Sequence, residues 1–249
     1  MSHIARLYVQ QPLIADQKID LPPDQSRYLT RVMRLEPGAP VRAFNGADGE
    51  WRCTLSGSPK SVALVPIEKI REQELGPDVN LLFAPIKKAR TDFIIEKATE
   101  LGVREILPVF TDYSQTNRVR IDRFESLAVE AAEQTERMDI PNVHEPQNLP
   151  KLLSEWDTSR VLIFCDESAE VAPLSSFSHK ISEKPAAILI GPEGGFSPKE
   201  REMLSALDFV IAMTLGPRIL RAESAVVSAL TRWQSQLGDW QKSPYLPES

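Results

Sequence analysis

Two segments of the chain join glycine-rich turns to charged side chains, a combination that could hold a small ligand and do chemistry on it. The first, residues 186–200 (AAILIGPEGGFSPKE), predicts an apolar strand, a turn and a helix. Ser197 and Glu200 form an S-x-x-E capping box with Pro198 at the first helical position, which fixes where the helix begins. The second, residues 215–225 (LGPRILRAESA), also lies between a strand and a helix. Ligands bind at the carboxyl edge of open parallel sheets, so we expect both turns to wall one pocket.

The charges in these turns indicate which ligand they suit. The G-x-x-x-x-G-K-[ST] pattern of a phosphate-binding loop is absent, and Glu193 stands among the glycines. A carboxylate there repels phosphate and suits a neutral or cationic ligand such as S-adenosylmethionine, which carries a sulfonium and an adenine. The first segment alone fits equally well with a plain tight turn. The second, with Arg218, Arg221 and Glu223 together, favours a functional pocket.

These motifs resemble the SPOUT methyltransferases, and more closely the family that methylates N3 of a uridine in 16S ribosomal RNA (the RsmE family). The resemblance extends over nearly the whole chain. The residues that carry it are Gly191-Pro192-Glu193-Gly194-Gly195, 215–225, Arg31-Val32-Met33-Arg34-Leu35, 93–103 (FIIEKATELGV) and 133–137 (EQTER). Glu136 departs from the family pattern, in which a small residue, often Gly, is expected.

The resemblance implies a fold and a set of site residues. It implies an α/β protein with a small PUA-like β-barrel for RNA and a SPOUT-type C-terminal domain, whose parallel sheet carries a trefoil knot. It also implies a homodimer and a cofactor, S-adenosyl-L-methionine, held bent in the knot. The expected cofactor-binding residues are Leu189, Ile190, Gly191, Pro192, Glu193, Gly194, Gly195, Leu215, Gly216, Ile219, Leu220, Ser224 and Ala225.

Arg221 and Glu223 are the expected catalytic residues. N3 of uracil is a poor nucleophile while it is protonated, so methyl transfer needs removal of that proton. Negative charge then develops on the uracil carbonyl oxygens, which a guanidinium can stabilise. We assign that role to Arg221, with Glu223 as orienting carboxylate or base; solvent is the alternative base. In the plainer alternative, Arg221 and Glu223 only pair with each other and cap the last helix.

The elements that position these residues fall into two predicted domains, residues 1–72 and 78–240. The first contains short β-rich runs and one helix, Asp24–Met33, with Asp24 as its N-cap. A charged Gly-Pro segment, Glu72–Asp78, predicts a linker. The second alternates strands with helices, which indicates a mainly parallel sheet covered on both faces. Its predicted strands are Val79–Ala84, Glu105–Phe110, Val161–Cys165, Ala186–Ile190 and Phe209–Leu215. Its predicted helices are Thr91–Leu101, Asp122–Arg137, Pro198–Leu207 and Glu223–Leu237.

RNA contacts are predicted mainly in the first domain. Arg27, Arg31 and Arg34 are spaced i, i+4, i+7, which places three guanidiniums in one helical stripe suited to phosphates, with Val32 on the other side. A solvated charged face is the alternative, although three like charges without an acid between them favour a polyanionic partner. Lys87 and Arg137 are further candidates.

The bulk composition limits the remaining functions. The net charge is −6, yet residues 1–72 carry a balance of +2 and the remainder −8, so RNA binding is not excluded. No apolar run is long enough for a membrane span. Cys53 and Cys165 lie in apolar strands, which predicts buried free thiols and no disulfide, and no histidine has metal-ligand spacing. We expect a cytoplasmic protein without a metal.

The predicted function is S-adenosylmethionine-dependent methylation of N3 of a specific uridine in 16S rRNA. The resemblance implies a uridine near the decoding region and a substrate within the 30S subunit. One alternative is another SPOUT enzyme, such as a ribose 2′-O-methyltransferase. A second is a non-catalytic RNA-binding factor of ribosome assembly that keeps a cofactor-like pocket. A nucleotide-phosphate binder is a distant third.

Overall fold

The computed structural model describes residues 4–58, 61–116, 118–167 and 184–245. The chain divides into two compact units. The N-terminal unit comprises Met1–Leu75, Ala132–Ile140 and Pro244–Ser249, and the C-terminal unit comprises Gly76–Ala131 and Pro141–Ser243. The first unit therefore contains a turn from the middle of the chain, which the sequence does not predict.

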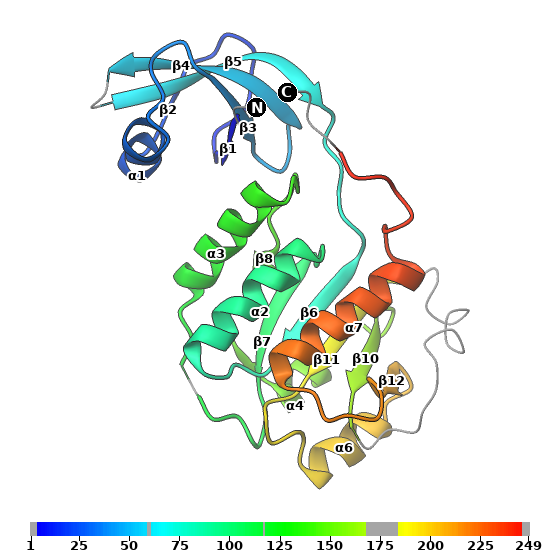
Figure 1. Cartoon of the computed structure of the whole chain (residues 1–249). Coiled ribbons are helices and arrows are strands. Elements are labelled where there is room, and N and C mark those ends of the chain that lie inside the picture. Colours follow the sequence, from blue (N-terminus) through cyan, green and yellow to red (C-terminus); the bar gives the residue numbers. More distant parts are fainter. Residues whose placement is uncertain (1–3, 59–60, 117, 168–183, 246–249) are drawn as a thin grey trace. The chain divides into compact units, whose positions relative to one another are not determined.

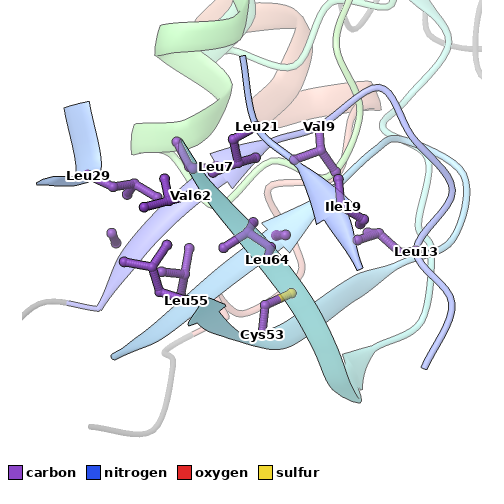
Figure 2. Close-up of a cluster of buried hydrophobic side chains, with 13 residues drawn as sticks. Leu7, Val9, Leu13, Ile19, Leu21, Leu29, Cys53, Leu55, Val62 and Leu64 are labelled. Atoms are coloured by element: carbon purple, nitrogen blue, oxygen red, sulfur yellow. The ribbon is translucent and has the colours of Figure 1, made fainter. Parts of the chain in front are cut away.

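The N-terminal unit is built on a five-stranded sheet in the order β1-β3-β4-β5-β2. β1 and β3 are parallel, and the other pairs are antiparallel. One face of the sheet covers the core shown in Figure 2, where Leu7, Leu55 and Leu64 are almost fully buried. The strands are β1 (Ala5–Tyr8), β2 (Ile19–Asp20), β3 (Pro40–Phe44), β4 (Glu50–Ser58) and β5 (Ser61–Arg71).

The predicted helix at Asp24–Met33 is present in a different form. It consists of α1 (Pro23–Arg27) and a π-helical segment, Tyr28–Val32. The prediction that Asp24 is the N-cap is wrong, because Pro22 occupies that position and Pro23 follows at N1. Proline needs no hydrogen bond there and its φ suits the first turn.

The change of helix type also alters the predicted arginine stripe. A π-helix has a wider turn than an α-helix, so i, i+4, i+7 spacing no longer defines one line. Arg34 lies beyond the helix in the left-handed region, with φ of 55°. Val32 is 67% exposed, although the sequence predicted it on the side away from the arginines. Arg27 and Arg31 remain exposed.

A buried ionic cluster holds the 132–140 turn inside the N-terminal unit. Arg6 Nε donates to Glu50 Oε1 over 2.5 Å, and its two terminal nitrogens donate to the carbonyls of Ala132 and Arg137. Glu136 accepts two hydrogen bonds from Arg42, at 2.5 and 2.7 Å. The cluster therefore ties strand residues to a turn that is distant in the sequence.

Glu136 has left-handed backbone geometry, with φ of 59°. A small residue such as glycine, which the resemblance leads us to expect at this position, would adopt that conformation without steric cost. Burial raises the pKa of the Glu136 carboxyl, but the hydrogen bond from Arg42 and the charges of Arg42, Arg6 and Arg71 lower it more, so the net shift is below its ordinary value of 4.5. The glutamate thus offsets backbone strain with ion pairs.

We predict that Glu136→Gln lowers the free energy of unfolding of this unit by about 1–3 kcal/mol at pH 7, because it removes the anion from a partly buried charged network. A carboxylate with a depressed pKa contributes stability above its unfolded-state pKa and loses it as the pH falls through the folded-state pKa. The deficit should therefore be complete at neutral pH and disappear in acid. Urea unfolding at a series of pH values measures this.

Glu68→Gln is the matched control, since Glu68 pairs with Arg52 on the surface, where both side chains are more than half exposed. Such pairs contribute little. Equal, pH-independent effects of the two substitutions would contradict the assigned role of Glu136.

The C-terminal unit contains a seven-stranded sheet in which every pair is parallel. The order is β12-β10-β11-β6-β7-β8, and β9 also pairs with β7. The strands are β6 (Val79–Phe83), β7 (Glu105–Phe110), β8 (Asn142–Val143), β9 (Gln147–Asn148), β10 (Val161–Cys165), β11 (Ala186–Ile190) and β12 (Val210–Met213). The sequence predicted the five longer strands and missed β8 and β9, which have two residues each.

Helices cover this sheet because its strands are apolar on both faces. One face packs on α4 and α6 through a core that includes Leu82, Phe164 and Leu189. α2 and α7 contact each other and lie over the strands in Figure 1. The helices are α2 (Lys88–Glu100), α3 (Ile121–Gln134), α4 (Leu149–Ser154), α6 (Pro198–Ser205) and α7 (Ala222–Leu237).

Two differences from the predicted helices have physical causes. The helix predicted to reach Arg137 ends at Gln134, because Glu136 leaves the right-handed region. α4 was missed because its six residues are too few to show a helical period. The knot stays a prediction.

Candidate functional site

A pocket lies where β10, β11 and β12 end. These strands are adjacent and parallel, so the chain segments that follow them meet at one edge of the sheet. The lining comes from residues 165–167 at the end of β10, from 190–196 at the end of β11 and from 214–220 after β12. Ala222 and Ala225 from the first turns of α7 complete the lining. The two segments that the sequence singled out therefore do wall one pocket.

Most of the predicted cofactor residues line this pocket. They are Ile190, Gly191, Pro192, Gly195, Leu215, Gly216, Ile219, Leu220 and Ala225. Leu189 does not, because its side chain is fully buried in the sheet core. Ser224 is exposed on α7 and does not line the pocket either.

Glu193 and Gly194 are also outside the lining. Gly194 faces the loop after β7, where a Cβ on this residue would lie 3.3 Å from Cβ of Tyr113. Gly191 is the more constrained glycine, because a Cβ there would come within 2.6 Å of the Phe196 ring. Packing therefore holds this turn in place, against Tyr113, which is distant in sequence, and against Phe196, which follows the turn directly.

The capping box predicted for α6 is confirmed. Ser197 Oγ accepts from Glu200 N at 3.2 Å, and Glu200 Oε2 accepts from Ser197 N at 2.8 Å. The box is also connected to the loop after β7. Ser197 Oγ lies 2.6 Å from Asp112 Oδ2, and Asp112 N donates to Glu200 Oε1 at 2.9 Å.

Sequence reasoning missed the segment after β10. Asp166 and Glu167 line the pocket, and both carboxylates pair with Arg201 of α6, Asp166 through two contacts near 3.0 Å. The sequence could have indicated these residues, because they follow a third predicted parallel strand and therefore lie at the same edge of the sheet. Cys165 lies there too, and burial raises the pKa of its thiol to about 12, so it is neutral at pH 7.

Glu193 and Glu223 are brought together by an arginine that the sequence did not single out. Arg90 Nη1 of α2 donates to Glu193 Oε1 at 3.0 Å, and Arg90 Nε lies 3.5 Å from Glu223 Oε1. Glu223 is 17% exposed, and its Oε2 is buried without a hydrogen-bond partner among the described residues. Arg90 thus engages one oxygen of the Glu223 carboxylate and leaves the other without a hydrogen bond in the described part of the chain.

Arg221 is exposed at the N-cap of α7, outside the pocket lining. Within the described chain it forms no ion pair with Glu223, whose partner is Arg90. The simple pairing of Arg221 with Glu223 is therefore wrong. Arg218, also exposed, lines the pocket.

The predicted RNA-contact residues are mostly open to solvent. Arg27, Arg31 and Arg34 are exposed on the N-terminal unit, and Lys87 is exposed just before α2. Arg137 is different, because its side chain is 9% exposed and bound to Asp139 at 2.9 Å. It is part of the internal structure of the turn and is not an open phosphate contact.

Comparisons with known proteins identify the family of this chain. An RNA methyltransferase domain model matches residues 73–234, and an RNA methyltransferase PUA domain model matches residues 21–67. The ribosomal RNA small subunit methyltransferase E of Rickettsia conorii is 30% identical over 91% of this chain and 93% of its own length. The protein of the same name from Bacillus subtilis is 32% identical over 84% and 86%.

The fold also matches a solved structure. A Legionella pneumophila protein, described as a methyltransferase in complex with S-adenosylmethionine, is 26% identical with a TM-score of 0.87. The match covers 96% of this chain and 100% of that chain. The N-terminal unit accordingly contains a PUA domain, and the C-terminal unit has the SPOUT-type parallel sheet. With matching models for both domains and relatives matched over most of their length, this chain belongs to the ribosomal RNA small subunit methyltransferase E family of RNA methyltransferases.

Proposed function

We propose that this enzyme methylates N3 of a specific uridine in 16S rRNA, within the 30S subunit and near the decoding region. The single observation that supports this most directly is the buried Oε2 of Glu223, which has no hydrogen-bond partner among the described residues and follows the segment 214–220 that contributes to the pocket. A base methylation at N3 needs an acceptor for a proton, which a buried carboxylate provides. The names of the relatives supply the substrate class.

We propose that residues 1–72 form the RNA-binding domain and residues 78–240 the methyltransferase domain. The enzyme is proposed to act in the cytoplasm, where ribosomal subunits assemble, and as a homodimer. No helix in the described part of the chain is long and apolar enough to cross a membrane. Sedimentation of a fully active monomer at working concentration would refute the dimer.

Deletion of the gene, followed by nucleoside analysis of 16S RNA, tests the function. We expect 3-methyluridine to disappear from 16S RNA and to return when the enzyme is supplied from a plasmid. Its retention in the deletion strain would rule out the proposed substrate. Loss of a 2′-O-methylated nucleoside would instead support the ribose methyltransferase alternative.

The pocket suits S-adenosylmethionine chemically. Its lining includes the carboxylates Asp166 and Glu167, which pair with Arg201, and the exposed Arg218, so it offers groups of both signs to the sulfonium and the carboxylate of this cofactor. When bound, this cofactor supplies an electrophilic methyl group on a sulfonium. The cavity measures about 70 Å³, whereas small-molecule pockets hold ~300–1,000 Å³. We therefore propose that the segment after β12, where Ile219 is 86% exposed, moves outward as the cofactor enters.

Enlarging Ala225, which lines the pocket from α7, tests its assignment. We predict that Ala225→Leu weakens S-adenosylmethionine binding roughly tenfold or more, because overpacking costs about 1–3 kcal/mol. Gln236→Leu, at an exposed position of the same helix, is the control and should bind normally. Calorimetry measures both. If the two variants bound S-adenosylmethionine with equal affinity, the cofactor would have to bind elsewhere.

The residues beside the pocket have distinct proposed roles. Glu223 Oε2 accepts the N3 proton, and Arg90 holds Glu223 through Oε1. The deprotonated N3 would then be the nucleophile for the methyl group that the bound cofactor would supply. Arg221, exposed and without an ion pair among the described residues, stabilises the charge on the uracil oxygens.

Glu223→Gln should reduce kcat by roughly 10²–10⁴-fold, while the Kd for S-adenosylmethionine stays within error. Arg90→Met should lower kcat as well, because Glu223 loses its orienting cation. Arg90→Lys should recover part of that loss. Single-turnover methylation measures all three.

Glu202→Gln, an exposed site on α6, controls for the loss of a carboxylate. An unchanged kcat in Glu223→Gln would mean that solvent takes the proton.

Phosphate contacts on the N-terminal unit are proposed for Arg27, Arg31 and Arg34, with Lys87 contributing from the C-terminal unit. The support is that these side chains are exposed. Each phosphate neutralised releases counterions. Replacing the three arginines with Gln should therefore lower the slope of log Kd against log salt by roughly two to three. An unaltered slope would leave this surface without its assigned role.

A further inference from the structure

A second pocket of the C-terminal unit is lined by cations that the methyl-transfer site does not use. It lies among the segment after β6, the first turns of α2, the end of the loop after β7, and the start of α3. The strands are parallel, so this pocket is at the same edge of the sheet as the cofactor pocket. Its charged lining residues are Lys88, Asp92, Arg118, Arg120 and Arg123.

The lining carries an excess of positive charge, although the chain as a whole has a net charge of −6. The single carboxylate among the described lining residues, Asp92, is already bound by Arg123 through two hydrogen bonds of 2.8 and 2.6 Å. Arg120 pairs with Asp122, but their side chains are 74% and 66% exposed, so the pair is weak. Lys88 and Arg118 are exposed and have no ion-pair partner in the part of the chain that the structure describes.

The buried floor and the volume of the pocket limit which ligands it can bind. Ile86, Thr91 and Phe124 are buried beneath the cations, so the ligand has an anionic and a less polar part. The pocket volume is about 210 Å³, below the ~300–1,000 Å³ of usual small-molecule sites. A phosphate with its adjoining sugar fits this description better than a complete cofactor.

The loop after β7 contacts the cap of α6 at its start and lines this pocket at its end. At its start, Asp112 is hydrogen-bonded to Ser197 and Glu200 of the α6 cap, and Tyr113 packs beside Gly194. At its end, Arg118 and Arg120 line the basic pocket. Tyr113 is 46% exposed between these two points, and exposed aromatic rings are the usual platforms for stacking RNA bases.

We propose that this basic pocket binds a backbone phosphate of the substrate RNA, next to the nucleotide that is methylated. The proposal rests on the proposed function. Lys88 and Arg118 supply the charge, and the Asp92–Arg123 pair holds the wall in place. The surface on the N-terminal unit then binds RNA separately, while this pocket fixes the strand beside the methyl-transfer site. A free phosphate ion carries the same chemical group, so the experiment must distinguish a phosphate of the RNA backbone from inorganic phosphate in solution.

The test uses the full chain carrying Lys88→Gln with Arg118→Gln. The control, Lys151→Gln with Lys242→Gln, removes the same charge from exposed lysines elsewhere in this unit. Binding of labelled 16S rRNA within 30S subunits is measured at several salt concentrations, together with methylation kinetics and cofactor affinity. The replaced residues are exposed, so folding should persist, and unchanged cofactor binding verifies it.

We expect the salt slope to fall by roughly 0.7–0.9 for each phosphate that the variant no longer neutralises. KM for RNA should rise several-fold while kcat and cofactor affinity stay near those of the parent enzyme. Arg118→Glu should have a larger effect on KM than Arg118→Gln. A slope and KM equal to those of the control would overturn the proposal.

Titration with inorganic phosphate distinguishes the other source. Phosphate that stabilises the parent but not the double variant, with RNA binding unchanged, would identify a free-anion site and also overturn the proposal. A parent that neither binds nor methylates 16S rRNA would refute the proposed function itself. An active parent enzyme whose double variant behaves like the control would instead overturn only the role of the basic pocket.

Discussion

The functional arrangement depends on one constraint, the parallel direction of every strand in the C-terminal sheet. Parallel strands end at the same edge, so five chain segments that are far apart in sequence meet there. Those after β10, β11 and β12 enclose the proposed cofactor pocket, and those after β6 and β7 enclose the basic pocket. The apolar strands allow this because helices cover both faces, leaving the edge for polar loops.

Hydrogen bonds and ion pairs between these loops determine which charges are available. Arg201 is bound to Asp166 and Glu167, and Arg123 is bound to Asp92, so these groups mainly shape walls. The guanidinium of Arg90 pairs with both Glu193 and Glu223, and the second carboxylate oxygen of Glu223 has no hydrogen-bond partner among the described residues. A negative net charge is therefore compatible with RNA binding, because the acids near the site are largely engaged internally.

The N-terminal unit uses ion pairs for a different purpose. The turn after α3 would be strained at Glu136, whose backbone is left-handed, and a glycine would avoid that strain. This chain has a glutamate there, which Arg6, Arg42 and Arg71 surround. The departure from the expected pattern thus has a structural explanation, because the ion pairs of the Glu136 side chain compensate for the strained backbone conformation of this residue.

Local sequence patterns determined most of the longer elements and most of the lining of the proposed cofactor pocket. Apolar runs bounded by turn residues defined the five long strands, and the Ser197–Glu200 box defined where α6 begins, because these signals act over a few residues. Only the tertiary structure showed that Asp166 and Glu167 line the pocket, that Arg90 binds Glu223, and that Arg137 is internal. Those facts depend on which strands are neighbours and on long-range charge pairing, which spacing along the chain does not encode. The helix also ends before Arg34, whose left-handed backbone takes it off the predicted stripe, and the wider turn of the π-helical segment changes the spacing on which the stripe depended.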